Sequence, residues 1–160
     1  MTESFAPIAI VGRGCVLPDA LTPAELWANA LEGRDSIASV PDGRWRIRPE
    51  LALRSPDDRD PDRSWTDRGG YVRGFGDVFR PGGFLTPAEQ LAPLDPLVHW
   101  LLHAGREALA EAGYGVGDPA LRSAGAIIGN LSFPSSALSA AVEWELLDAF
   151  PGWRERLGMR

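Results

Sequence analysis

The sequence contains one cysteine, no lysine and no apolar run long enough to span a membrane. Cys15 alone can form neither an internal disulfide nor a cysteine-based metal site. All sixteen basic residues are arginine, which excludes Schiff-base formation and lysine nucleophiles. Residues 1–7 lack the basic and apolar segments of a signal peptide. We therefore expect a cytoplasmic protein that does not associate with a membrane.

Charge and composition narrow the function classes further. The net charge of −6 opposes nucleic-acid binding, because a broad contact with phosphates needs a basic surface. With 160 residues, 44% of them apolar, the chain is large enough for one globular domain with a hydrophobic core.

Two helices have clear start and stop signals. Thr22 is followed by proline and, three residues on, by Glu25, a pattern typical of a capping box. Gly33 predicts the end of this helix. The second helix is predicted over about 96–112, with Asp95 as its N-cap. The apolar stripe expected on the first helix consists of Leu26, Trp27, Ala30 and Leu31.

Two short apolar runs predict buried strands, at residues 8–11 and 123–129. The first is short, rich in β-branched residues and ended by glycine, as expected for a strand that is buried on both faces. A third helix, rich in alanine and leucine, is expected over 137–150. The order strand, helix, irregular segment, helix, strand, helix is typical of an α/β protein with parallel strands.

The segment 34–84 contains most of the prolines and glycines. We expect mostly loops that pack through aromatic residues as an irregular cap, because so long a structureless loop is improbable. The alternating aspartates and arginines at 57–68 indicate a solvated loop with weak ion pairs. The residues Leu-Thr-Pro-Ala-Glu at 21–25 recur at 85–89, so we expect a helix start at both places.

The sequence Gly12-Arg13-Gly14 follows the first predicted strand, as a dinucleotide-binding loop would. That fingerprint needs a third glycine at position 17, where leucine stands, and a helix that begins directly after the turn. Here the next helix begins only at about residue 23. A tight turn that ends the strand is favoured, with a nucleotide site as the alternative.

Neither the histidines nor the cysteine form a recognisable catalytic or metal motif. His99 and His103 are one helical turn apart, but a metal site needs at least one more ligand and no zinc-protease motif surrounds them. We expect them to make surface or partner contacts. Cys15 has no histidine nearby in the sequence, so a buried structural thiol is favoured over a nucleophile.

Seven short phrases lie at 8–15, 23–27, 31–35, 40–45, 68–71, 95–96 and 107–113. They resemble, in the same order, the start of β-ketoacyl synthase (ketosynthase) domains. Each phrase is weak alone, and their order over residues 8–129 carries the resemblance. After residues 95–96 polyketide ketosynthases usually have Gln-Gln-Arg, whereas this chain has Leu-Val-His. With Gly-Asn-Leu-Ser-Phe-Pro at 129–134, this is more similar to the polyunsaturated-fatty-acid synthase type.

The resemblance implies a thiolase-like α/β fold with two halves, of which residues 1–160 form an incomplete N-terminal portion with 34–84 as a cap. The family carries out decarboxylative Claisen condensation in polyketide or fatty-acid biosynthesis. No cofactor is bound directly, because the substrates are carried on the phosphopantetheine of an acyl carrier protein. The implied partners are the remainder of the ketosynthase domain, a second subunit in a homodimer and the carrier protein.

The resemblance assigns no catalytic residue to this chain. The family's nucleophilic cysteine lies in an Ala-Cys-(Ser/Ala)-Ser phrase that does not occur here, and its two histidine motifs belong to the other half. The chain alone is therefore expected to be inactive. In the family the turn after the second strand lies near the acyl pocket and the dimer contact. The candidates for these contacts are Asn130, Leu131, Ser132 and Phe133.

Three function classes follow. The first is the N-terminal part of a condensing enzyme. The second is a non-catalytic module that docks a carrier protein or forms a dimer. The third is a small nucleotide-binding α/β enzyme that uses the turn at residues 12–14.

Overall fold

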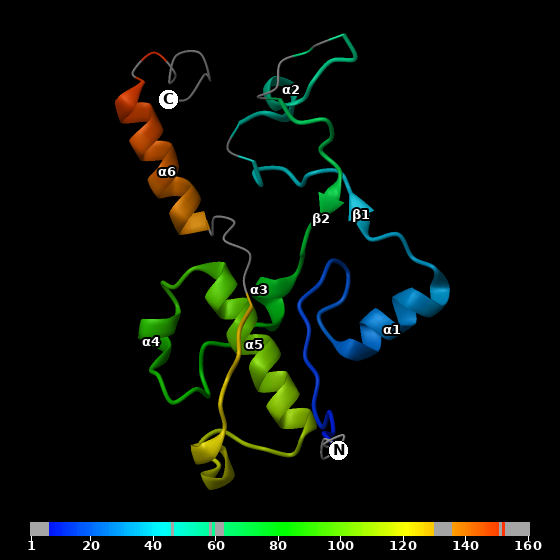
Figure 1. Cartoon of the computed structure of the whole chain (residues 1–160), viewed down its shortest axis with the longest axis vertical. Helices are drawn as coiled ribbons and strands as arrows, with labels where there is room; N and C mark the ends of the chain where they lie inside the picture. The colour runs from blue at the N-terminus through cyan, green and yellow to red at the C-terminus, as the bar shows by residue number, and fades with distance from the viewer. Residues whose placement is uncertain are drawn as a thin grey trace, which may run out of the picture.

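The computed structural model describes residues 7–45, 47–57, 59, 63–129, 136–150 and 152. The helix α5 (Pro96–Glu111) lies at the centre, and the shorter elements surround it (Figure 1). Within the described residues, no helix combines the length and apolar character that a membrane span requires. The other elements are α1 (Pro23–Glu32), β1 (Ile37–Ala38), α2 (Pro49–Ala52), β2 (Gly69–Gly70), α3 (Phe75–Val78), α4 (Ala88–Leu91), the 3₁₀ helix η1 (Pro119–Ser123) and α6 (Ser136–Ala149).

Helix α1 begins and ends where the sequence predicts. The Glu25 amide donates to Thr22 Oγ1 at 3.2 Å, and the Thr22 amide donates to Glu25 Oε2 at 3.0 Å, which completes the capping box. Gly33 ends the helix in the left-handed conformation, with φ 64°. These signals are local in the chain, so they act without any tertiary partner.

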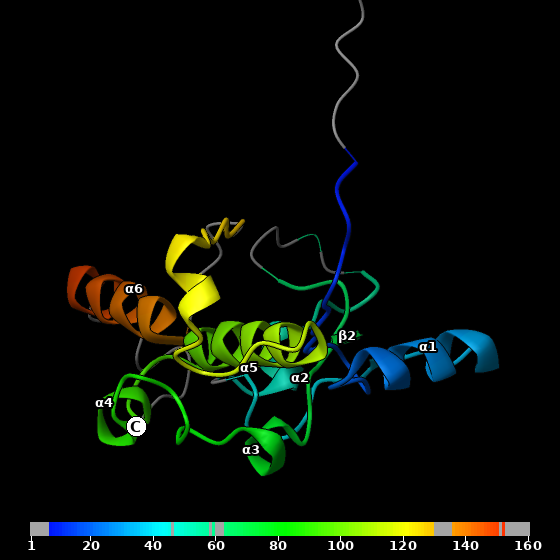
Figure 2. The same ribbon diagram turned by 90° about the horizontal axis from the view of Figure 1, so that it is seen from below.

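The apolar stripe of α1 does not face a core. Trp27 is 66% exposed and Leu31 is 70% exposed. The helix projects away from the other elements in both views (Figures 1 and 2). The amphipathic pattern predicted the helix correctly, but within the described chain much of its apolar face is exposed.

Helices α5 and α6 also match their predictions. Asp95 caps α5, accepting a hydrogen bond at Oδ1 from the Leu97 amide at 2.8 Å, and Gly113 follows its end with φ 85°. Helix α6 covers almost the whole span expected for the third helix. The second copy of Leu-Thr-Pro-Ala-Glu behaves differently from the first, because α4 begins only after Pro87 and has no side-chain cap.

The two predicted buried strands do not form, so the expected parallel pairing is wrong for the described chain. Residues 8–11 and 124–129 pair with no other segment there, and Ile8 is 89% exposed. The sheet present is small and antiparallel, with Ile37 opposite Gly70 and Ala38 opposite Gly69. A strand forms only when a second strand satisfies its main-chain groups, and this condition cannot be judged from one run of residues.

The segment 34–84 contains β1, α2, β2 and α3, joined by loops. Its aromatic residues differ in their contacts and exposure. Phe75 and Phe79 stack on one another with ring centroids 5.4 Å apart. Trp65 is exposed, although the guanidinium of Arg54 lies 4.1 Å from its ring centre. Arg68 forms an ion pair with Asp35 at 3.2 Å and donates to the Ile37 carbonyl at 3.0 Å, which links β1 to the residues before β2.

The hydrophobic core of the described chain is very small. Ala20 and Leu91 are the hydrophobic residues that are buried there, and His103 is buried with them. Among the described residues, no two helices share an extended contact. The secondary structure is therefore held mainly by caps, turns and contacts with α5.

Gly12 and Gly14 lie directly against the main chain of α5. A Cβ atom on Gly12 would come within 1.9 Å of the Ala108 carbonyl oxygen, and one on Gly14 within 2.1 Å of the Ala104 oxygen. Neither glycine has a positive φ. The two glycines are therefore required for a close approach between two segments, and the tight turn predicted for them is absent.

We expect Gly12→Ala to destabilise the chain by about 1–3 kcal/mol, because helix α5 or the N-terminal segment must shift to admit the methyl group. Gly105→Ala is the matched control. Gly105 lies within α5 with open space around its Cβ position, so the alanine should stabilise the helix by up to about 1 kcal/mol. Urea unfolding followed by circular dichroism gives both values. Equal midpoints for wild type and Gly12→Ala would contradict the close contact.

Candidate functional site

Helix α5 carries both histidines of the chain, together with Arg106, Glu107 and Glu111. The N-terminal segment lies along it at Gly12 and Gly14. Between these glycines, the main-chain amide and the guanidinium of Arg13 both bind the carboxylate of Glu111, with Nη2 2.6 Å from Oε1. The hydrogen bond from the Arg13 side chain lowers the pKa of Glu111, and the Glu111 carboxylate raises the pKa of Arg13.

This arrangement argues against a nucleotide site at residues 12–14. A phosphate-binding loop leaves main-chain amides free to face the ligand. Here the Arg13 amide is used by Glu111, and the space beside both glycines is filled by α5. The two glycines therefore have a packing role.

The two histidines of α5 belong to an aromatic cluster with Phe75 and Phe79. The His99 ring stacks on Phe79 with centroids 4.5 Å apart, and its Nε2 lies 2.8 Å from the Leu91 carbonyl oxygen. His103 contacts Phe75 edge-on at 5.5 Å and is only 6% exposed, so the surface position expected for it is wrong. Within the described residues no group of three or more metal-ligating side chains includes either histidine.

Cys15 has the environment of a structural thiol. It is partly buried, and its Sγ lies 4.0 Å from the Ala20 carbonyl oxygen. Burial raises the pKa of the thiol, and the negative charge of Glu25 raises it further. Both effects reduce the thiolate fraction at neutral pH, which is the opposite of what a nucleophile needs.

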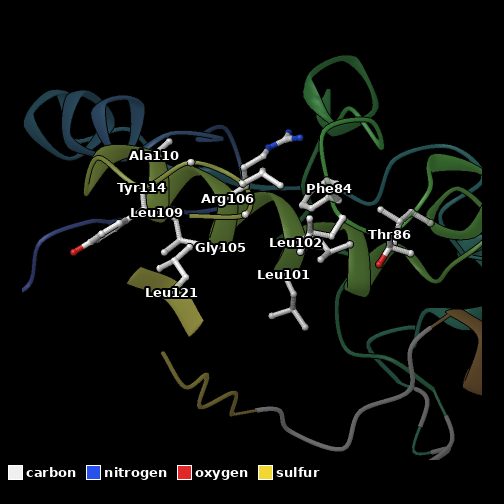
Figure 3. A pocket seen from close by; sticks show the side chains of 15 residues that line it. Phe84, Thr86, Leu101, Leu102, Gly105, Arg106, Leu109, Ala110, Tyr114 and Leu121 are labelled. Atoms are coloured by element: carbon white, nitrogen blue, oxygen red, sulfur yellow. The ribbon is translucent and has the colours of Figure 1, made fainter. Parts of the chain in front are cut away.

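An open apolar groove of about 540 Å³ runs along another face of α5. Figure 3 shows Leu109, Tyr114 and Leu121 gathered at one end, with Leu102 and Phe84 near the other. The groove is formed by α5 together with the segments around residues 84–86 and 114–121. Its lining is mostly apolar, so it suits an apolar occupant.

Arg106 forms part of the groove wall and holds one side of it in place. Its Nη1 donates to the Arg80 carbonyl at 3.0 Å, and its guanidinium lies 4.9 Å from the centre of the Phe84 ring. The side chain thereby ties the loop after α3 to α5.

The pocket candidates Asn130, Leu131, Ser132 and Phe133 lie outside the described residues. Their role as pocket residues therefore stays a prediction. The groove and the aromatic cluster were not predicted from the sequence. The i,i+4 spacing of Phe75 and Phe79, matched by that of His99 and His103, is the signal that could have indicated the cluster.

Comparison with known proteins identifies a family. Residues 5–145 match the model of the β-ketoacyl synthase N-terminal domain. The chain is 38% identical over 114 residues to erythronolide synthase EryA2 of Saccharopolyspora erythraea, which covers 69% of this chain. It is 38% identical over 115 residues to mycoketide-CoA synthase of Mycobacterium tuberculosis, which covers 70% of this chain. Each match spans only 3% of the relative's length.

A solved structure shows the same relation. The keto synthase–chain length factor PfaC aligns with a TM-score of 0.71 and 32% identity, over 80% of this chain and 13% of that one. The structure described here accordingly corresponds to part of a ketosynthase, with mixed helices and a small sheet. The chain belongs to the β-ketoacyl synthase family and contains the region that matches the family's N-terminal domain.

Proposed function

We propose that this chain is the N-terminal part of a β-ketoacyl-[acyl carrier protein] synthase domain in a polyketide or polyunsaturated-fatty-acid synthase. The family match over residues 5–145 carries the proposal. The reaction is a decarboxylative condensation. The bond between the malonyl α-carbon and its carboxylate breaks with release of CO₂, that carbon bonds to the acyl carbonyl, and the cysteine thiolate that carried the acyl group leaves.

Under this proposal the chain contributes to the scaffold of the synthase domain and supplies no catalytic residue. Its single cysteine, Cys15, is partly buried, and its two histidines contact the aromatic rings of Phe75 and Phe79. The nucleophilic cysteine and the histidine pair come from the remainder of the domain.

We further propose that residues 1–160 form one part of that domain, with 34–84 as its cap and Asn130, Leu131, Ser132 and Phe133 near the acyl pocket or dimer contact. The acyl carrier protein and a second synthase subunit are the proposed partners.

A non-catalytic docking or dimerisation module is the second candidate. The exposed apolar side chains of α1 favour it, since Trp27 and Leu31 present a surface suited to a partner. The two candidates differ in whether the complete protein forms a carbon–carbon bond. A nucleotide-dependent enzyme is disfavoured by the packing of Gly12 and Gly14 against α5.

Purified residues 1–160 should form no β-ketoacyl product from acyl and malonyl thioesters of a carrier protein, because the nucleophile and the histidine pair lie elsewhere. The complete synthase domain that contains this chain should form it, with release of CO₂. Mass spectrometry of the carrier-bound product measures both. Product from residues 1–160 alone would place a nucleophile in this chain, whereas no product from the complete domain would favour the docking module.

Cys15→Ala should leave the condensation rate of the complete domain within a few-fold of wild type, since a thiol with a raised pKa does not carry the acyl group. Alkylation of Cys15 by iodoacetamide at neutral pH should also be slower than that of a free cysteine peptide. A rate loss above about a hundredfold, or about 2.7 kcal/mol of barrier, with unchanged circular dichroism would show that Cys15 is catalytic.

A further inference from the structure

The apolar groove along α5 has a gap at its centre. Figure 3 shows Leu101, Gly105 and Leu109 in order along the helix, and their spacing by four residues places them on one side of it. Leu101 is 43% exposed and Leu109 is 40% exposed, and the Cβ position of Gly105 has open space around it. The groove therefore has room for one large side chain between two leucines.

Helix α1 presents a row of side chains with the complementary shape. Pro23, Trp27 and Leu31 are also spaced by four residues, and the largest of the three stands at the centre. Both rows extend over eight residues, which is about 12 Å of helix. When two helices pack, rows spaced by four residues interdigitate, and a large residue fits best opposite a small one. The row on α1 therefore matches the groove in length, spacing and shape.

The charges of the two surfaces are also complementary. Arg106 is the one charged residue among those that line the groove in the described chain. Helix α1 carries Glu25 and Glu32 and no basic residue in its sequence. An arginine in the groove wall favours an acidic helix over a basic one, because unlike charges attract and like charges repel.

The helix that fits this groove must come from a second molecule. The α1 of the same chain borders α5 at a separate cleft, which is lined by Thr22, Trp27 and Glu107 among others. Glu107 is two positions from Gly105, so this cleft lies on nearly the opposite side of α5 from the groove. Trp27 borders the cleft and is still 66% exposed, on a helix that projects away from the other elements (Figures 1 and 2).

We propose that two copies of this chain form a symmetric dimer, in which the α1 of each copy lies in the α5 groove of the other with Trp27 opposite Gly105. Each copy has one such helix and one such groove, so the contact forms twice about a two-fold axis. This doubles the buried area, which helps to reach the about 1,200 Å² of a stable interface. The proposal goes beyond the proposed function, and its surfaces are distinct from the dimer-contact candidates at 130–133.

Sedimentation of purified residues 1–160 tests the contact. The wild-type chain should dimerise at about micromolar concentration. Trp27→Ala removes the large side chain and Gly105→Leu fills the gap, so each should weaken dimerisation by at least about tenfold. The matched control is Trp65→Ala, which removes an exposed tryptophan outside both surfaces and should dimerise within about twofold of wild type.

A mixture of the two variants separates loss of the contact from loss of the fold. Trp27→Ala keeps an intact groove and Gly105→Leu keeps an intact α1, so a mixed dimer retains one of the two contacts. The mixture should therefore associate more tightly than either variant alone, which misfolded variants would not do. Leucine also favours helix, so the helical circular dichroism of Gly105→Leu should match that of wild type.

Three results would overturn the proposal: a wild-type monomer at about 100 μM, equal dimerisation by Trp27→Ala and Trp65→Ala, or a mixture that associates no better than its components. A monomer that binds a hydrophobic dye, with binding lost in Gly105→Leu, would also overturn it and identify an apolar small molecule as the occupant. Because no condensation product is measured, any of these results would leave the proposed function unaffected.

Discussion

The close contact between residues 12–14 and helix α5 is the constraint on which the rest of the structure depends. It places the N-terminal segment against the centre of the molecule, where the Ala104 and Ala108 carbonyls leave no room for a side chain. Arg13 fixes the same contact from outside through Glu111. Few hydrophobic residues are buried in the described chain, so its conformation depends mainly on this contact and on the helix caps.

Features set by neighbouring residues could be predicted from the sequence, and features set by distant ones could not. The capping box of α1 and the Asp95 cap of α5 need only the residues within one helical turn, and both formed as expected. The strands at 8–11 and 123–129 need a partner strand, which a run of isoleucines does not supply. The two copies of Leu-Thr-Pro-Ala-Glu also show the influence of distant residues, since Thr22 caps a helix and the matching Thr86 does not.

The candidate site shows the same difference between features set by neighbouring residues and features set by distant ones. The missing third glycine and the late start of the next helix disfavoured a nucleotide loop, and the packing of α5 against Gly12 and Gly14 also argues against it. The position of His103 depends on where α3 lies, because Phe75 covers the ring from a different part of the chain. Periodicity along α5 could not show which helical face α3 would cover, so a surface position was expected for a residue that is buried.

Several titratable groups of the described chain hold its segments together. Arg13 and Glu111 neutralise one another across the contact with α5, His99 is held by the Leu91 carbonyl, and the Cys15 thiol has a raised pKa. A general base or nucleophile must be free to exchange a proton near neutral pH. These groups are instead used to hold the N-terminal segment, α5 and the aromatic cluster together.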